Sequence, residues 1–167
     1  MLLGVASFEG VKRRQQIRGE VNGITVIDDF AHHPTAVRET VSALRLAWPE
    51  RRLLVVFEPR TNTSRRAVFQ QEYETAFNGA DMVLVREIVP LDHAAQGDSF
   101  SSQQLAAALN AQGIRAEYFP DTDAILAFLL AQAQSGDVIA IFSNGGFDNI
   151  HARLLERLRT LLSNSSG

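Results

Sequence analysis

The chain has 167 residues, of which 46% are hydrophobic and 21% charged, and its formal net charge is −3. These values are typical of one globular domain with its own core and untypical of a disordered chain. The charge gives no electrostatic reason for binding nucleic acid or an anionic membrane, and the lack of cysteine excludes disulfides and thiolate metal sites. No apolar run approaches the length that crosses a bilayer, and we expect a cytoplasmic protein.

The first half of the chain predicts a hairpin and then alternating helices and strands. Residues 15–29 surround Asn22-Gly23, the pair that favours a tight type I′ turn. Pro34 is expected to begin a helix that Pro49 ends. Leu53–Phe57 and Met82–Val85 are apolar runs typical of strands buried on both faces. The helix expected between them buries one side, formed by Phe69, Tyr73, Ala76 and Phe77.

The second half continues this alternation. Ser101 and Asp121 are expected to cap two helices that flank an edge strand at Arg115–Phe119. Val138–Phe142 predicts another buried strand, and a last helix follows. Its expected inner face consists of Ile150, Leu154, Leu158 and Leu161. The alternation indicates an α/β fold that is Rossmann-like and doubly wound, with a mainly parallel sheet and an N-terminal β-hairpin.

Polar residues gather where the predicted strands end, which is where such sheets bind ligands. Asp28–Pro34 (DDFAHHP) holds two carboxylates and two imidazoles between a strand and a helix. The other loops at this end begin at Glu58, Arg86 and Ser143. Their several arginines suit a substrate that is rich in carboxylate or phosphate.

Simpler interpretations of the same residues stay open. Asp29 could only cap a turn, and His33 could only begin the helix at Pro34. A hydrolytic metal site could use the oxygen and nitrogen ligands of Asp28, Asp29, His32 and His33. A dinuclear site of this kind usually needs further ligands from other loops, and the chain has only two other histidines, His93 and His151.

The chain holds no phosphate-binding P-loop. Lys12 is the only lysine among the 16 lysine and arginine residues, and neither Ser nor Thr follows it. If the chain handles ATP, the usual cradle for the phosphates therefore lies elsewhere.

Asp28–Thr35, with Gly10–Arg14 (GVKRR) upstream and a hairpin between them, resembles the motif that opens the C-terminal domain of the Mur ligases. These enzymes assemble the UDP-muramoyl peptide precursors of bacterial peptidoglycan, and the resemblance covers nearly the whole chain. Phe57–Thr63 (FEPRTNT) and Ser143–Phe147 (SNGGF), the latter followed by Ile150-His151, are similar to murein peptide ligases rather than to the ligases that add L-alanine. Gln15-Gln16 and Asp148-Asn149 depart from the family pattern.

The resemblance implies a lid domain at residues 15–162, with a linker or domain edge at 1–14 and a tail at 163–167. The full enzyme would join L-alanyl-γ-D-glutamyl-meso-diaminopimelate to UDP-N-acetylmuramate during peptidoglycan recycling. ATP would first form an acyl phosphate, which the tripeptide amine then attacks. The central ATPase domain of the same polypeptide would supply most Mg²⁺ ligands, so no metal ligand is expected here and the isolated domain is expected to be inactive.

The resemblance also implies roles for individual residues. His32 is expected to be catalytic, near the phosphates or the forming tetrahedral centre. The expected ATP-binding residues are Arg13, Arg14 and Asp29. The expected substrate-binding residues are His33, Arg60, Asn62, Arg86, Ser143 and Asn144, with Arg60 pairing with an acceptor carboxylate.

Three alternatives remain beside this interpretation. The domain could belong to a ligase that adds L-alanine to UDP-N-acetylmuramate. It could also be a metal-dependent hydrolase, or a non-enzymatic nucleotide-binding module.

Overall fold

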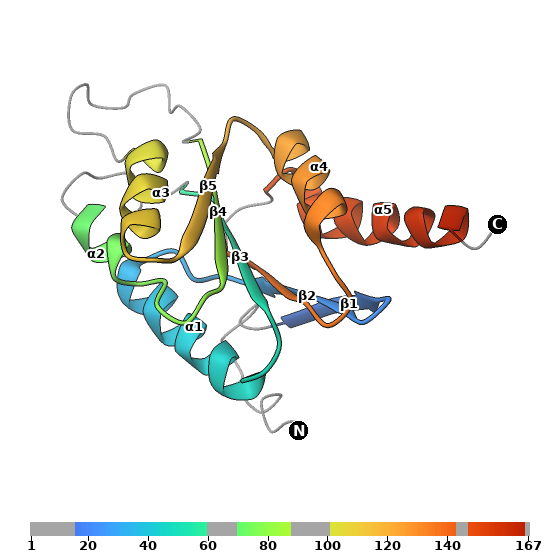
Figure 1. The fold of residues 1–167 in the computed structure, drawn as a ribbon, viewed down its shortest axis with the longest axis horizontal. Coiled ribbons are helices and arrows are strands. Elements are labelled where there is room, and N and C mark those ends of the chain that lie inside the picture. The colour runs from blue at the N-terminus through green and yellow to red at the C-terminus, as the bar shows by residue number, and fades with distance from the viewer. Residues whose placement is uncertain (1–15, 60–69, 88–100, 143–146, 166–167) are drawn as a thin grey trace.

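The computed structural model describes residues 16–59, 70–87, 101–142 and 147–165, with side chains described up to Leu161. These residues form one six-stranded sheet in the order β1-β2-β6-β3-β4-β5 (Figure 1). The strands are β1 (Gln16–Val21), β2 (Ile24–Asp29), β3 (Leu53–Phe57), β4 (Met82–Arg86), β5 (Arg115–Phe119) and β6 (Val138–Phe142). The helices are α1 (Pro34–Ala47), α2 (Gln70–Glu74), α3 (Ser102–Ala111), α4 (Thr122–Gln132) and α5 (Ile150–Ser165), with a 3₁₀ turn η3 (Phe147–Asn149) before α5.

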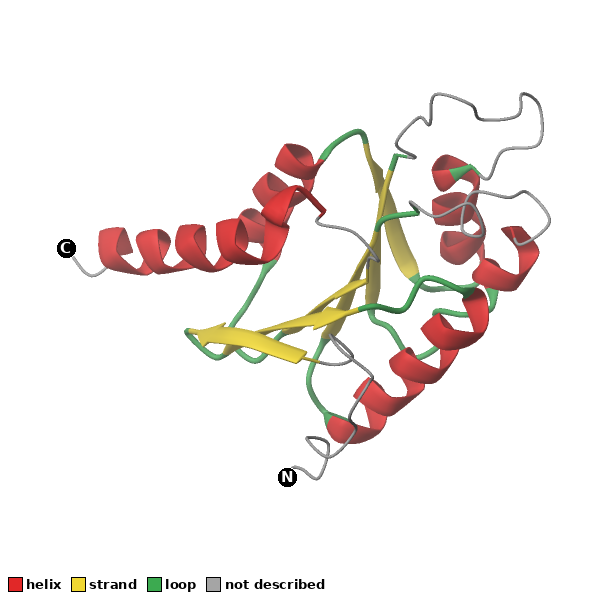
Figure 2. Cartoon of the chain, turned by 180° about the vertical axis from the view of Figure 1, so that it is seen from behind, coloured by secondary structure: helices red, strands yellow, loops and turns green. Residues whose placement is uncertain are grey.

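The sheet is parallel except for the β1–β2 hairpin. Helices α1, α2 and α3 cover one face, and α4 and α5 cover the other (Figures 1 and 2). This arrangement confirms the predicted doubly wound α/β fold with an N-terminal hairpin. Strand β6 lies between β2 and β3, so the last strand in the chain is central in the sheet.

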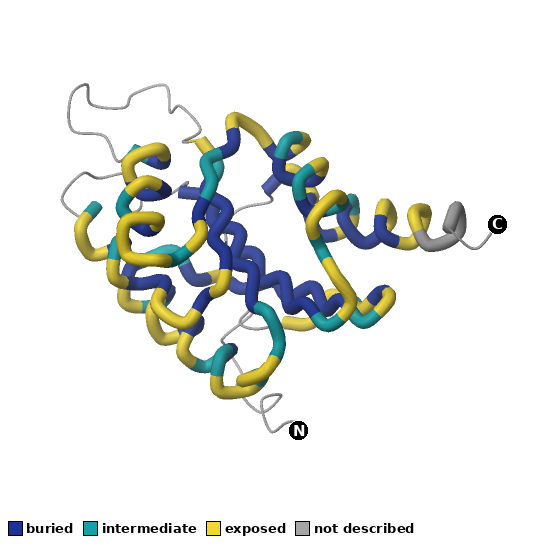
Figure 3. The backbone as a smooth tube through the Cα atoms, in the orientation of Figure 1, coloured by how far each residue is buried: buried dark blue, intermediate teal, exposed yellow. Residues whose placement is uncertain are grey.

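Two apolar cores lie on opposite faces of the sheet because successive residues of a strand point to opposite sides. In β3, Val55 and Phe57 belong to the core beneath α1 to α3, and Leu54 and Val56 belong to the core beneath α4 and α5. Buried residues accordingly run continuously along the central strands (Figure 3). This burial on both faces is the property that the uninterrupted apolar runs predicted.

The predicted turn and caps are confirmed. Asn22 and Gly23 have φ values of 54° and 79°, as a type I′ turn requires at both positions. The side chain of Ser101 accepts a hydrogen bond from Gln104 N at 3.1 Å and begins α3, and that of Asp121 accepts one from Ala124 N at 2.8 Å and begins α4. The edge position of β5 is also confirmed.

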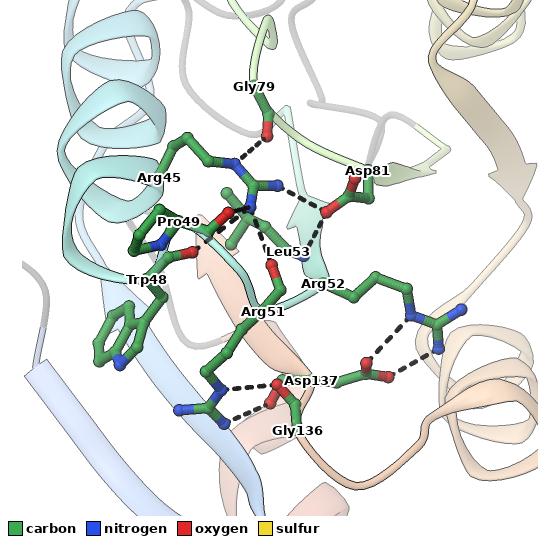
Figure 4. Close-up of polar contacts among 10 residues, drawn as sticks. All are labelled: Arg45, Trp48, Pro49, Arg51, Arg52, Leu53, Gly79, Asp81, Gly136 and Asp137. Atoms are coloured by element: carbon green, nitrogen blue, oxygen red, sulfur yellow. Dashed lines mark hydrogen bonds and ion pairs between the residues drawn. The ribbon is translucent and has the colours of Figure 1, made fainter.

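Three arginines tie the loops together at the amino end of the parallel strands (Figure 4). Arg45, from α1, donates to the carbonyl oxygens of Arg51 and Gly79, each at 2.9 Å. Arg51 donates to Gly136 O at 2.6 Å and to Gly23 O at 2.9 Å. Arg52 holds the carboxylate of Asp137 with two bonds of 3.0 and 2.7 Å, and we name the three side chains Arg45, Arg51 and Arg52 the arginine clamp.

Some sequence-based details differ from the structure. The helix predicted to carry Tyr73, Ala76 and Phe77 ends at Glu74, although all three residues are buried, and Phe69 lies outside the described residues. Leu161 is 43% exposed rather than on the inner face of α5, because the helix extends beyond the sheet (Figure 1). Helix α5 also continues to Ser165, past the predicted start of the tail.

Among the described helices, none combines the length and the apolar composition needed to cross a membrane.

Candidate functional site at the carboxyl end of the sheet

Four parallel strands bring their following loops to one end of the sheet. Strands β2, β3, β4 and β6 end at Asp29, Phe57, Arg86 and Phe142, and their registers align these ends. Just beyond, the backbone N–H of Glu58 donates to Phe142 O at 3.2 Å and joins the exits of β3 and β6. The structure therefore brings the predicted ligand loops together at their origins.

Asp28 and Asp29 point to opposite faces of the sheet, because they are successive strand residues. The Asp28 carboxylate contacts His151 of α5, and the Asp29 carboxylate bonds to Ala31, which belongs to the core beneath α1 to α3. The two carboxylates thus cannot ligate one ion, as the metal interpretation required. Within the described parts of the chain, no three His, Asp or Glu residues gather as a metal site.

Asp29 shapes the turn that follows β2. Its Oδ1 accepts a hydrogen bond from Ala31 N at 2.7 Å, and the residue is only 1% exposed. A carboxylate that bonds to the amide two residues later forms an Asx turn. Asp29 therefore does cap a turn, which directs the chain from β2 toward the two histidines.

The two histidines differ in which ring nitrogen carries hydrogen. Nδ1 of His32 lies 3.0 Å from the carbonyl oxygen of Phe30, which can only accept, so Nδ1 donates and Nε2 is the basic nitrogen of the neutral ring. Nδ1 of His33 instead accepts from Thr35 N at 3.3 Å, so Nε2 carries the hydrogen. The side chain of His33 caps α1, so this residue does begin the helix, and both rings are half-buried.

A buried tyrosine bonds to the backbone of the turn that carries the two histidines. The hydroxyl of Tyr73 donates to the carbonyl oxygen of His32, and the Tyr73 ring packs 5.2 Å from that of Phe57. Burial, followed by the charge of Glu72, raises the pKa of Tyr73 above its ordinary value of about 10. The hydroxyl is thus a neutral, fixed donor to the turn.

Asp28 lies on the other face, beside Arg18 and His151. Nη1 of Arg18 is 3.2 Å from Oδ2 of Asp28, and Nε2 of His151 is 3.1 Å from Oδ1 without the alignment of a hydrogen bond. The side chains of Asp28 and His151 are 0% and 4% exposed. The pairing of β1 with β2 shifts between Ile17 and Gly19, and such a bulge re-aims the side chain that it contains, here Arg18.

Arg86 ends β4 in a polar network that reaches α4 and η3. Its Nε donates to Thr122 Oγ1 at 3.2 Å, and its Nη2 lies 3.5 Å from Oδ2 of Asp148. Thr122 Oγ1 also donates to Asp148 at 2.6 Å. Asp148 is the middle of three successive residues with positive φ, from Phe147 (47°) to Asn149 (58°), a conformation that non-glycine residues rarely adopt. Asp148, which departs from the family pattern, therefore forms an ion pair with Arg86.

Six predicted site residues lie outside the described residues: Arg13, Arg14, Arg60, Asn62, Ser143 and Asn144. The sequence interpretation did not assign Arg18, Tyr73 or His151 to the site. His151 had a usable signal, because it precedes Leu154, Leu155 and Leu158 at helical spacing and so lies on the inner face of α5.

A doubly wound α/β domain with its polar turns at one end of a parallel sheet is a ligand-handling domain. Its sequence specifies the family further, because residues 13–145 match the model of the Mur ligase, glutamate ligase domain. The chain belongs to this family and is a Mur ligase C-terminal domain.

Three relatives illustrate the likeness. A UDP-N-acetylmuramate–L-alanine ligase of Geobacter sulfurreducens is 40% identical over 85% of this chain and 30% of its own length. The Escherichia coli UDP-N-acetylmuramate–L-alanyl-γ-D-glutamyl-meso-2,6-diaminoheptandioate ligase is 36% identical over 92% of this chain and 32% of its own. A crystal structure of a Psychrobacter arcticus murein peptide ligase aligns with a TM-score of 0.72 and 34% identity, over 92% of this chain and 31% of that one. The chain thus spans about a third of the length of these relatives.

Proposed function

We propose that this chain is the lid domain, at residues 15–162, of an ATP-dependent ligase that joins L-alanyl-γ-D-glutamyl-meso-diaminopimelate to UDP-N-acetylmuramate. The family supports ligation, and the tripeptide acceptor rests on the sequence of the segment Phe57–Thr63, which begins at the last residue of β3. Its first residues, Phe57 to Pro59, are buried at the exit of a central strand, so the chain continues toward Arg60 from a fixed point. A central domain of the same polypeptide would bind the ATP phosphates.

His32 is the residue that we place nearest the chemistry. The reaction must remove a proton from the attacking amine, and a neutral imidazole can accept one when its free nitrogen is basic. Because Nδ1 of His32 is committed to Phe30 O, Nε2 is that nitrogen. The Asx turn of Asp29 and the hydroxyl of Tyr73 fix the backbone that carries the ring.

On the ATP side, we propose roles for Arg13, Arg14 and Asp29. Asp29 is buried and bonded to Ala31 N, which supports a contribution through the shape of the turn. Mg²⁺ would neutralise phosphate charge in this reaction. Asp28 and Asp29 face apart, which supports our assignment of the Mg²⁺ ligands to the central domain.

On the acceptor side, we propose that Arg60 binds a carboxylate of the tripeptide. His33, Arg86 and the residues Asn62, Ser143 and Asn144 would contribute further polar contacts. Arg86 is 14% exposed and already oriented by Thr122 and Asp148, which would lower the entropy cost of holding a ligand carboxylate.

A second acceptor, free L-alanine, is favoured by the 40% identity to the L-alanine ligase of Geobacter sulfurreducens. The two acceptors differ in size and in the number of carboxylates. A ligase that uses L-alanine has no need of a cation for a distant carboxylate.

The test is ligation by the full-length enzyme that carries this domain, with UDP-N-acetylmuramate, ATP and either acceptor. We expect turnover with the tripeptide and little with L-alanine. Arg60→Ala should weaken tripeptide binding by about 2–5 kcal/mol if the contact is desolvated. Arg115→Ala is the matched control, because Arg115 begins β5 at the opposite end of the sheet and is 53% exposed. Preference for L-alanine would favour the second candidate, and no ATP-dependent ligation would contradict both.

A further inference from the structure

Asp28, Arg18 and His151 form a polar cluster, with Asp28 and His151 buried, that the proposed chemistry does not use. The Asp28 side chain is fully buried and lies among residues of the core beneath α4 and α5, which includes Val26 of the same strand face and Leu154. A carboxylate in such a place is stable only when cations or donors neutralise it. Arg18 and His151 approach one oxygen each.

The position of His151 gives this cluster more than a packing role. His151 is the second residue of α5 and follows the left-handed turn Phe147–Asn149. Asp28 immediately precedes Asp29, whose carboxylate forms the turn toward His32. The contact between His151 and Asp28 therefore joins the β6–α5 connection to the β2–α1 turn at one point.

This contact lies at the end of the strand ladder. Strands β2 and β6 pair up to Asp29 and Phe142, and the ladder stops where the two loops begin. Helix α5 places His151 Nε2 3.1 Å from Oδ1 of Asp28, which pairs with Ile141 one residue before the ladder ends. His151 thus contacts β2 one residue before the turn of Asp29 begins.

We propose that His151 is a positioning residue: through Nε2 and the Asp28 carboxylate it sets the geometry of the Asp29–His33 turn. The role in ligation rests on the proposed function, but the effect on the turn does not. His151 needs no contact with substrate for this role.

Two substitutions that differ only in reach test the contact. The terminal amide that His151→Gln introduces extends to about the place of Nε2, whereas the amide that His151→Asn introduces stops near Nδ1. Leu158→Ala is the control for stability alone, because Leu158 is 6% exposed on the same helix face and farther along α5.

The first measurement is amide NMR of the 167-residue chain. In His151→Asn we expect shifted resonances and lost exchange protection at Ala31, whose N–H is bonded to Asp29, and shifts at His32 and Thr35. His151→Gln and Leu158→Ala should leave these amides as in the parent. Equal behaviour of the Asn and Gln variants, or shifts confined to α5, would overturn the proposal.

The second measurement is kcat/KM of the full-length ligase at a temperature where every variant is folded by circular dichroism. We expect His151→Asn to lower kcat/KM by about 10-fold or more, since small misplacements of reacting groups are costly. His151→Gln and Leu158→Ala should stay close to the parent. An equal loss in Leu158→Ala would refute a positioning role in ligation. If no parent ligation is found, the proposed function fails, and the NMR result still decides the contact.

Discussion

Replacing Tyr73 with Phe removes a single oxygen from beneath the histidine turn. The ring is 0% exposed and stays packed against Phe57, so the substitution creates no large cavity. What changes is the carbonyl oxygen of His32, which loses the hydroxyl that donates to it. We expect the free energy of unfolding near neutral pH to fall by about 1–3 kcal/mol, the cost of leaving a buried polar group without its partner.

The raised pKa of Tyr73 also predicts how the free energy of unfolding changes with pH. Burial raises the pKa of Tyr73 above the value of about 10 of the unfolded chain, so the folded state keeps its proton longer. The contribution to stability is complete below about pH 10 and declines above it, by about 1.4 kcal/mol per pH unit while only the unfolded state ionises. Tyr73→Phe lacks this decline, so the stabilities of parent and variant should converge above about pH 10.

Urea unfolding followed by circular dichroism at a series of pH values measures both effects. Few other side chains ionise in the same pH range, because the chain has two tyrosines and Lys12 is its only lysine. Tyr118→Phe is the control: the pKa of Tyr118 is raised mainly by its hydrogen bond to Glu87, and its loss should leave the Tyr73 decline in place.

Two results would refute the reasoning about Tyr73. One is a parallel loss of stability in the parent and in Tyr73→Phe above about pH 10. The other is an unchanged free energy of unfolding near neutral pH, which would mean that the hydroxyl contributes nothing to the turn.

Three further substitutions test an ion pair, a helix cap and a turn outside the site. Arg52→Met should lower the free energy of unfolding by about 1–3 kcal/mol, because the Asp137 carboxylate, 3% exposed, loses a two-bond partner. Asp121→Ala should cost about 1 kcal/mol through the lost cap of α4, seen as a lower urea midpoint. Gly23→Ala should lower the melting temperature, at a cost of about 1–2 kcal/mol, because φ is 79° and a Cβ would lie 2.5 Å from Oγ of Ser135.

Each of these has a matched control or a contrary outcome. Arg115→Met removes an exposed ion pair with Glu117 and should change stability by less than about 1 kcal/mol. If Arg52→Met were equally mild, the arginine clamp would contribute little at that position. For the cap, Asp121→Asn should retain most of the stability that Asp121→Ala loses. A Gly23→Ala protein as stable as the parent would contradict the turn conformation.

The local elements could be predicted from the sequence because their signals are local. Asn22-Gly23 required a turn that only a few residue types adopt, and Pro34 begins α1 where its missing N–H costs nothing. The apolar runs at Leu53–Phe57 and Val138–Phe142 predicted strands covered on both faces. The location of the ligand loops at the carboxyl end of the sheet could be predicted from the parallel topology alone.

The partners inside the site could not be predicted, because they depend on distant elements meeting. Asp28 and Asp29 are neighbours in the sequence, yet the strand turns their side chains to opposite faces. Arg18 reaches Asp28 only through a bulge in β1. Asp148, in the turn before α5, meets Arg86 at the end of β4, a contact that no sequence spacing indicates.

The arginine clamp has a consequence for which positions can vary. Arg45 and Arg51 bind the main-chain carbonyl oxygens of Gly23, Gly79 and Gly136, and a carbonyl oxygen is present whatever residue occupies a position. The arginine clamp itself therefore places no demand on the side chains at these three positions, and it is their positive φ values of 79°, 106° and 98° that favour glycine there. Variation should thus be tolerated at other positions of these loops, but not at Asp81 and Asp137, whose carboxylates bind Arg45 and Arg52.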